Sequence, residues 1–213
     1  MGRSWIKRFG FGLVAILGLA TISSGQDHIT WTSFSVSKKL NDKFTVVVKP
    51  IFRHNVSTST YLNYSPDYML KYKLNSAWSF QVFGRSWIVP DGPDRQFLWF
   101  DAKHSKNFGD FNVSNTFRVH GAIDRFVTDG DFLRWHPYVK WNKHKKIQPL
   151  AGLQFFYQMN GLNELERIRY VLGAHVPLLD RHTLQIQYWD EVFYSRAEIQ
   201  RFNIWVINLA YTL

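Results

Sequence analysis

Side chains alternate between apolar and polar with a period of two along most of this chain. In the stretch RWHPYVKW (134–141), Trp135, Pro137, Val139 and Trp141 alternate with Arg134, His136, Tyr138 and Lys140. Successive side chains of a β-strand point to opposite faces, so this stretch would present one apolar and one polar face. The alternation therefore predicts a strand between two different environments, rather than a mixed aromatic and basic surface for nucleic acid.

The alternation recurs in eleven blocks, of which the first (29–40) is the least regular. Most blocks are longer than the five or six residues common in soluble β-sandwiches, and a tilted strand needs roughly nine to eleven residues to cross a bilayer. The blocks predict an all-β fold, an antiparallel up-and-down transmembrane β-barrel of about 10–12 strands. Bacterial single-chain barrels have an even number of strands. Either the first block is not a full strand, which gives ten, or a long block contains two, which gives twelve.

The connections between blocks alternate in length. Short polar turns are expected at 41–42, 75, 107–110, 143–146 and 179–182, and longer loops at 54–60, 89–94, 126–131, 159–164 and 194–200. Outer-membrane barrels have short periplasmic turns and longer extracellular loops. A soluble sandwich gives no reason for this regular alternation.

The N-terminus has the pattern of a secretory signal peptide. Arg3, Lys7 and Arg8 precede an apolar run at 9–20, and Ser23 and Gly25 suit a cleavage site. An uncleaved membrane anchor is the alternative, but the apolar run is shorter than the roughly 20 residues of a spanning helix. We predict a signal peptide over 1–25 and an outer-membrane barrel over 26–213, exported to the cell outer membrane of a Gram-negative bacterium.

The net charge of the chain indicates which binding partners to expect. The chain carries a net charge of +10, which favours nucleic acid or an anionic membrane. For an exported barrel we expect outer-membrane lipid, no nucleic acid, and a monomer. The chain has no cysteine, which excludes disulfides and thiolate chemistry. We expect no cofactor.

The last block resembles the C-terminal strand by which the assembly machinery recognises outer-membrane barrels. Trp205, Ile207, Leu209, Tyr211 and Leu213 share one face, and the row ends in Leu213 rather than phenylalanine. We therefore expect the barrel-assembly machinery to be a partner, through residues 205–213.

The polar rows predict a basic lumen. They contain eleven basic residues: Lys49, Arg53, Lys71, Lys73, Arg85, Lys103, Arg118, Arg134, Lys140, Arg167 and Arg169. Against them stand Asp67, Asp101, Asp124 and Glu191. In a barrel of this size side chains can largely fill the interior, so the charges must meet one another or a ligand.

Two interpretations of this lumen remain open. The charges could form a hydrogen-bonded ionic plug, because arginine binds carboxylates bidentately and unpaired charge is costly. Alternatively, the basic excess could attract a small acidic solute or a lipid headgroup phosphate. The candidate ligand-binding cluster is Arg53, Lys71, Arg85, Arg118, Arg134, His136, Lys140, Arg167 and Arg169.

A small lipid-modifying hydrolase embedded in the barrel is a third possibility. Its serine would need a histidine base, and the candidates are His104 with Ser105 and His120 with Ser114. Adjacent strand residues point to opposite faces, and six residues along one strand span about 20 Å. Neither pair is therefore a convincing catalytic pair. His120 and His136 have no evident carboxylate pair for a metal, and we assign no catalytic or metal-binding residue.

Three stretches carry a resemblance to a known family: WTSFSVSKKLNDKF (31–44), GLQFFYQMN (152–160) and LERIRYVLG (165–173). With them the mature chain resembles the domain of unknown function 2490 family of outer-membrane barrels. The resemblance implies a barrel in the outer membrane. It implies no activity and no site residues.

Overall fold

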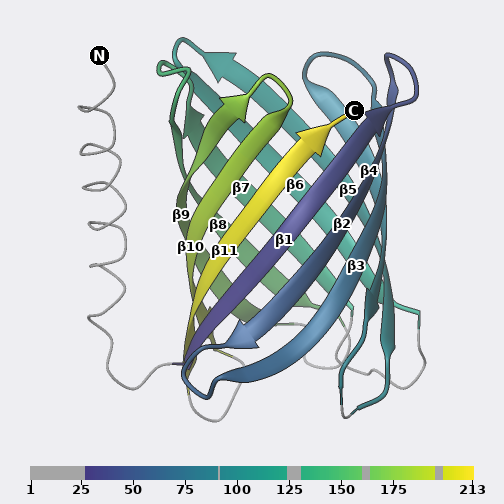
Figure 1. Cartoon of the computed structure of the whole chain (residues 1–213), viewed down its shortest axis with the longest axis vertical. Helices are drawn as coiled ribbons and strands as arrows, with labels where there is room; N and C mark the ends of the chain where they lie inside the picture. Colours follow the sequence, from purple (N-terminus) through teal and green to yellow (C-terminus); the bar gives the residue numbers. More distant parts are fainter. Residues whose placement is uncertain (1–26, 91, 124–130, 160–163, 195–198) are drawn as a thin grey trace.

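A computed structural model describes residues 27–90, 92–123, 131–159, 164–194 and 199–213 (Figure 1). The signal peptide predicted at 1–25 lies outside these residues. Strands make up nearly all of the described chain: β1 (Asp27–Lys39), β2 (Phe44–Asn55), β3 (Thr60–Lys73), β4 (Trp78–Trp87), β5 (Arg95–Phe108), β6 (Phe111–Ala122), β7 (Phe132–Trp141), β8 (Gln148–Gln158), β9 (Leu165–Leu179), β10 (His182–Phe193) and β11 (Gln200–Thr212). Within the described ranges no helix has the length and apolar character to span a membrane.

The strands form one closed barrel, so the predicted fold class is confirmed. Each strand pairs antiparallel with the next along the chain, and β1 pairs parallel with β11 to complete the wall. Figure 1 shows these two strands side by side and pointing the same way. The described chain contains eleven strands, and the expectation of ten or twelve was wrong. The irregular first block is a full strand. With an odd number of alternating strands, the first and last run in the same direction, so only a parallel pair can close the barrel.

Side chains inside the barrel support the parallel seam. The β1 and β11 ladders run in register from Asp27 opposite Phe202 to Ser37 opposite Thr212. The buried hydroxyl of Ser33 donates to Asn208 Oδ1 at 2.9 Å, and the Ser37 hydroxyl donates to the carbonyl of Tyr211 at 3.3 Å. Every described strand therefore has a neighbour on both sides, and the wall leaves no exposed strand edge.

The two predicted faces are the outer and inner faces of the wall. In β7, Trp135 and Val139 are exposed on the outside, whereas Arg134 and His136 point into the lumen. The same parity gives the other strands an outer surface of large apolar side chains. Asn115 interrupts the outer row of β6, and its side-chain oxygen accepts a hydrogen bond from Trp135 Nε1 at 3.3 Å. This neighbour explains how a polar side chain is tolerated there.

Turns and loops lie at opposite ends of the barrel (Figure 1). One end, the short-turn rim, carries the connections 40–43, 74–77, 109–110, 142–147 and 180–181. The other end, the long-loop rim, carries 56–59, 88–94, 123–131, 159–164 and 194–199. Residues 91, 124–130, 160–163 and 195–198 of the predicted loops lie outside the described residues.

One predicted long loop, 54–60, is a tight turn. The side-chain oxygen of Asn55 accepts hydrogen bonds from the backbone of Ser57 at 3.0 Å and Thr58 at 3.3 Å. Ser59 takes a positive φ of 53°, which completes the reversal. Because the asparagine cap closes the turn early, β2 and β3 extend further than the sequence suggested.

Gly152 on the inner face of β8 is packed against β7. A Cβ at this position would lie 2.3 Å from Tyr138 Cβ and 2.8 Å from the Pro137 carbonyl oxygen. We predict that Gly152→Ala lowers the free energy of unfolding by about 1–3 kcal/mol, because the strand pair must move apart. Urea titration in detergent, followed by tryptophan fluorescence, measures the change.

Gly84→Ala is the matched control, since Gly84 also lies within a strand and a Cβ there meets nothing within 4 Å. Superimposable unfolding curves for the two variants would contradict the close packing of β7 against β8.

Candidate anion-binding lumen

The eleven basic residues predicted for the lumen all lie on the inner rows of their strands. Strand pairing aligns several of them with Asp67, Asp101 and Glu191, the predicted acidic residues that the structure describes. Asp124, the fourth, lies outside the described residues. The parity of the alternation therefore placed these charges on one side of the wall, but it did not show which charges meet.

Two arginines form bidentate ion pairs across neighbouring strands. Arg85 Nε and Nη2 donate to Asp67 Oδ1 at 2.5 Å and Oδ2 at 2.7 Å. Arg118 makes the same two contacts with Asp101, at 2.5 and 2.7 Å. Both carboxylates are buried. In each case the register places the partners directly opposite, so the fork of the guanidinium fits the carboxylate.

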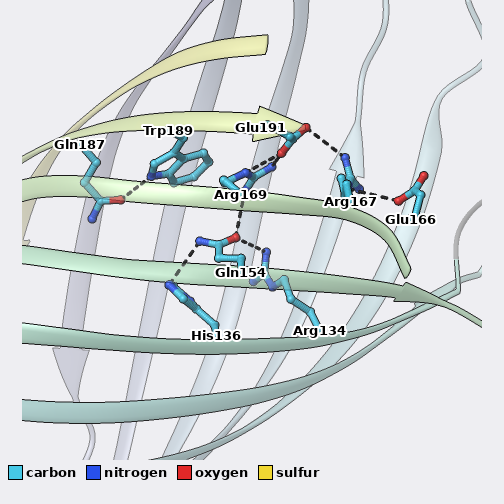
Figure 2. Close-up of polar contacts among 9 residues, drawn as sticks. All are labelled: Arg134, His136, Gln154, Glu166, Arg167, Arg169, Gln187, Trp189 and Glu191. Atoms are coloured by element: carbon cyan, nitrogen blue, oxygen red, sulfur yellow. Dashed lines mark hydrogen bonds and ion pairs between the residues drawn. The ribbon is translucent and has the colours of Figure 1, made fainter. Parts of the chain in front are cut away.

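Glu191 joins two arginines of β9 (Figure 2). Arg169 Nε donates to Glu191 Oε2 at 2.5 Å, and Arg167 Nη1 donates to Oε1 at 3.2 Å. Arg169 Nη1 also donates to the side-chain oxygen of Gln154 at 3.0 Å. Arg169 and Glu191 are both buried, and this network joins the neighbouring strands β8, β9 and β10 on the inner face of the wall.

Aromatic rings surround the arginines. The Arg53 guanidinium lies 4.1 Å from the ring centre of Trp31 and 4.9 Å from that of Trp87. Arg118 lies 4.7 Å from the ring of Trp99, and Arg167 lies 4.3 Å from that of Phe156. Such contacts strengthen when water is excluded.

We call this filled part of the lumen the arginine–aromatic plug. It consists of Arg53, Arg85, Arg118, Arg167, Arg169, Trp31, Phe83, Trp99 and Phe156. Most of its residues lie within a few positions of the long-loop rim. The sequence prediction missed its aromatic half, although the continuous apolar stretch FLWF (97–100) signalled an apolar side chain on both faces of β5.

The other half of the lumen is open. A cavity of about 570 Å³ begins among the turns of the short-turn rim and extends inward to Arg134 and His136. We call it the vestibule. Its charged lining comprises the basic residues Lys39, Lys43, Lys71, Lys73, Lys103, Arg118 and Arg134, and the acidic residues Asp42 and Asp101. Seven cations thus face two carboxylates, of which Asp101 is already paired with Arg118.

Neutral groups are the partners of three cations in and beside the vestibule. Arg134 Nη1 donates to the Gln154 oxygen at 3.5 Å, and Lys140 Nζ donates to the Gln148 oxygen at 3.2 Å. Lys103 Nζ contacts the Tyr138 hydroxyl at 3.4 Å. An amide or a phenol accepts a hydrogen bond without cancelling a charge.

The unpaired cations are the majority of the predicted set. Among the described residues, no carboxylate forms an ion pair with Lys49, Arg53, Lys71, Lys73, Lys103, Arg134 or Lys140. Four of the eleven basic residues, all of them arginines, are therefore paired with the carboxylates Asp67, Asp101, Glu166 and Glu191, and seven are not. Features of both interpretations that the sequence left open, paired and unpaired charges, therefore occur in one barrel. Arg53 is the plug arginine without a carboxylate among the described residues, and its Nη1 donates to Asn63 Oδ1 at 2.7 Å.

The candidate catalytic pairs do not assemble. His104 packs against Trp78 on the outer face, whereas the Ser105 hydroxyl donates to Asn112 Oδ1 inside the barrel. His120 packs between aromatic rings, with ring centres 5.0 Å from Phe97 and 4.8 Å from Trp99. In the part of the chain that is described, no three His, Asp or Glu side chains gather as a metal site would require.

An apolar outer face and a charged interior within a closed wall define a β-barrel of the porin-like class. A solved structure titled "NanC porin structure in rhombohedral crystal form" is similar, with a TM-score of 0.57 over 84% of this chain and 91% of that chain. At 12% identity this likeness shows the fold alone. The profile of the family described as "Protein of unknown function (DUF2490)" matches residues 29–209, and the chain belongs to that family. No curated protein sequence matches the chain.

Glu191 and Asp190 allow a direct test of the plug, because they are adjacent and face opposite sides of the wall. We predict that Glu191→Gln destabilises the barrel by about 3–5 kcal/mol, since it leaves Arg169 buried without a counter-charge and leaves Arg167 with Glu166 alone, 3.2 Å from its Nε. The measurement is the temperature at which the compact, fast-migrating band is lost from gels of samples heated in steps.

Asp190→Asn is the control. Asp190 pairs on the outer face with Arg201, whose side chain is 51% exposed, so its loss is expected to cost less than about 1 kcal/mol. If the two variants lose the compact band at the same temperature, the plug is not held by this ion pair network.

Proposed function

We propose that the protein is an outer-membrane barrel that binds small anions in the vestibule and is closed to free passage by the arginine–aromatic plug. The observation that carries this proposal is the lining of the vestibule, where seven basic side chains face two carboxylates around about 570 Å³. Sites for small molecules commonly measure roughly 300–1,000 Å³. A small acidic solute with carboxylate or phosphate groups fits this volume and charge.

The location in the outer membrane is supported by separate observations. The outer face is apolar, the fold is porin-like, and the first 25 residues have the sequence pattern of a signal peptide. The apolar outer row of β11, from Trp205 to Leu213, suits recognition by the barrel-assembly machinery. Complete closure within one chain is consistent with a monomer.

The direction of entry follows from the two rims. Short turns face the periplasm in outer-membrane barrels. The vestibule opens at the short-turn rim, and the plug fills the lumen toward the long-loop rim. A soluble anion would therefore enter from the periplasmic side, drawn by the field of the basic lining.

Conductance tests the plug. In planar bilayers the wild-type barrel is expected to pass little current, because aromatic and arginine side chains fill one half of the lumen. Trp99→Ala with Phe156→Ala removes two plug rings, and we expect larger, anion-preferring channels. Trp135→Ala, on the outer face, is the control. Large channels in the wild-type protein would disprove the closed lumen.

Calorimetric titration with citrate and with inorganic phosphate tests the vestibule. Lys71→Gln with Lys103→Gln is expected to weaken citrate binding by tenfold or more, since hydrogen bonds to charged groups contribute about 1.5–3 kcal/mol each. Lys143→Gln with Lys145→Gln removes the same charge from an outer turn and is expected to leave citrate binding unchanged at about 0.15 M salt, where the field of exposed charges is largely screened.

The same titration with a short-chain phosphatidylglycerol, added below its micellar concentration, tests whether the vestibule binds a lipid headgroup rather than a soluble anion. Equal citrate affinity in the wild type and the vestibule variant would refute binding at this site.

A further inference from the structure

The two rims of the barrel differ in exposed charge. Counted over the connections and the three strand residues on either side, the short-turn rim exposes ten basic side chains: Lys38, Lys39, Lys43, Lys71, Lys73, Lys106, Lys143, Lys145, Lys146 and Arg181. It exposes three acidic ones: Asp42, Asp110 and Asp180. The described part of the long-loop rim, counted in the same way and with the first residues of β1 included, exposes two of each: Asp27, Asp94, Arg95 and Arg201. The basic excess of the described surface is therefore concentrated on one rim.

Part of this excess faces outward, away from the vestibule. Lys38 and Lys106 lie on the outer rows of β1 and β5, and the turn 142–147 contributes Lys143, Lys145 and Lys146. Lys106 Nζ lies 5.2 Å from the ring centre of Phe108, so its stem follows the aromatic surface while the ammonium reaches the rim. None of these five lysines lines the vestibule.

Aromatic pairs form a girdle just inside the same rim. On neighbouring strands, ring centres lie 5.1 Å apart for Phe44 and Tyr72, 4.8 Å for Trp78 and His104, 6.5 Å for Phe111 and Trp141, and 4.8 Å for His182 and Tyr211. Aromatic girdles of barrels lie at the boundary between hydrocarbon and headgroups. The lysines beyond the girdle therefore stand at the level of the lipid phosphates.

We propose that the outward lysines of the short-turn rim bind the headgroups of anionic phospholipids, with the turn 142–147 as the strongest contact. The inference rests on the membrane-spanning barrel of the proposed function, but it does not depend on the vestibule. A zwitterionic headgroup carries an ammonium that offsets its phosphate. A cationic rim at headgroup level therefore favours lipids with a net negative charge. Trp141 lies beside this turn, with its ring centre 4.9 Å from that of His144.

Quenching of tryptophan fluorescence by brominated lipid measures this preference. The protein is reconstituted in bilayers of phosphatidylethanolamine and phosphatidylglycerol, with bromine on one lipid and then on the other. Trp78, Trp135, Trp141 and Trp205 face outward, and Trp141→Phe isolates the signal from the turn 142–147. The wild-type protein is expected to be quenched more strongly by brominated phosphatidylglycerol than its bulk fraction predicts, and the excess should fall as salt is raised.

Two charge-matched variants identify the source of the preference. Lys143→Gln with Lys145→Gln is expected to lower the relative affinity for phosphatidylglycerol by roughly threefold to tenfold, while citrate binding at about 0.15 M salt stays unchanged. Lys71→Gln with Lys103→Gln removes the same charge inside the vestibule and should keep the lipid preference while losing citrate binding. The two proposals can thus fail separately.

Two results would overturn the lipid proposal. One is quenching by the two brominated lipids in proportion to their bulk fractions. The other is an unchanged preference in the Lys143 and Lys145 variant, with its folded state verified by heat-modifiable migration.

Discussion

A strand wall in lipid must satisfy its backbone N–H and C=O groups within itself, because hydrocarbon offers no hydrogen-bonding partner. In this chain the described wall meets that requirement by pairing β1 with β11. Ten antiparallel steps along eleven strands leave the two ends pointing the same way, so the closing ladder is parallel. Parallel pairing is slightly less stable per residue. At this seam the side chains of Ser33 and Asn208 add a hydrogen bond inside the barrel. Closure then determines which side chains must share the interior.

The distribution of carboxylates divides that interior. Asp67, Asp101 and Glu191 lie opposite or beside arginines. Each carboxylate accepts hydrogen bonds from a guanidinium. Aromatic rings fill the space around these pairs and exclude water, which makes an unpaired charge costly. Arg53, which no described carboxylate pairs with, is instead held by Asn63 and by the rings of Trp31 and Trp87. Lysine dominates the vestibule instead. An ammonium on a flexible stem is strongly hydrated and does not need a fixed planar partner. In the proposed function, the paired arginines hold the plug, and the unpaired lysines keep a hydrated basic surface available to anions.

Most of the fold could be predicted from the sequence, but fewer of the contacts inside the barrel could. Period-two alternation identified the faces of the strands, including those of RWHPYVKW, because parity is a local property of the chain. The parallel seam could not be read in this way, since it joins residues more than 170 positions apart. Register also decides that Asp101 lies opposite Arg118, and it is set by pairing along the whole wall. The inner aromatic residues were missed for another reason. Phe97 and Trp99 belong to a continuous apolar stretch, and alternation assigns no polar face there.

The rim lysines and the vestibule share one end of the barrel, and their fields add. An anion near the short-turn rim meets a positive potential before it reaches Lys71 or Lys103, so the rim raises its local concentration at the opening. Bound anionic lipid would offset part of that potential. The effect of lipid on the vestibule would then be long-range and screened by salt over about 10 Å at 0.1 M, whereas direct contacts with Lys103 and Arg134 inside the barrel are screened much less. Attraction toward the opening and retention at the floor thus depend on different residues and differ in their sensitivity to ionic strength.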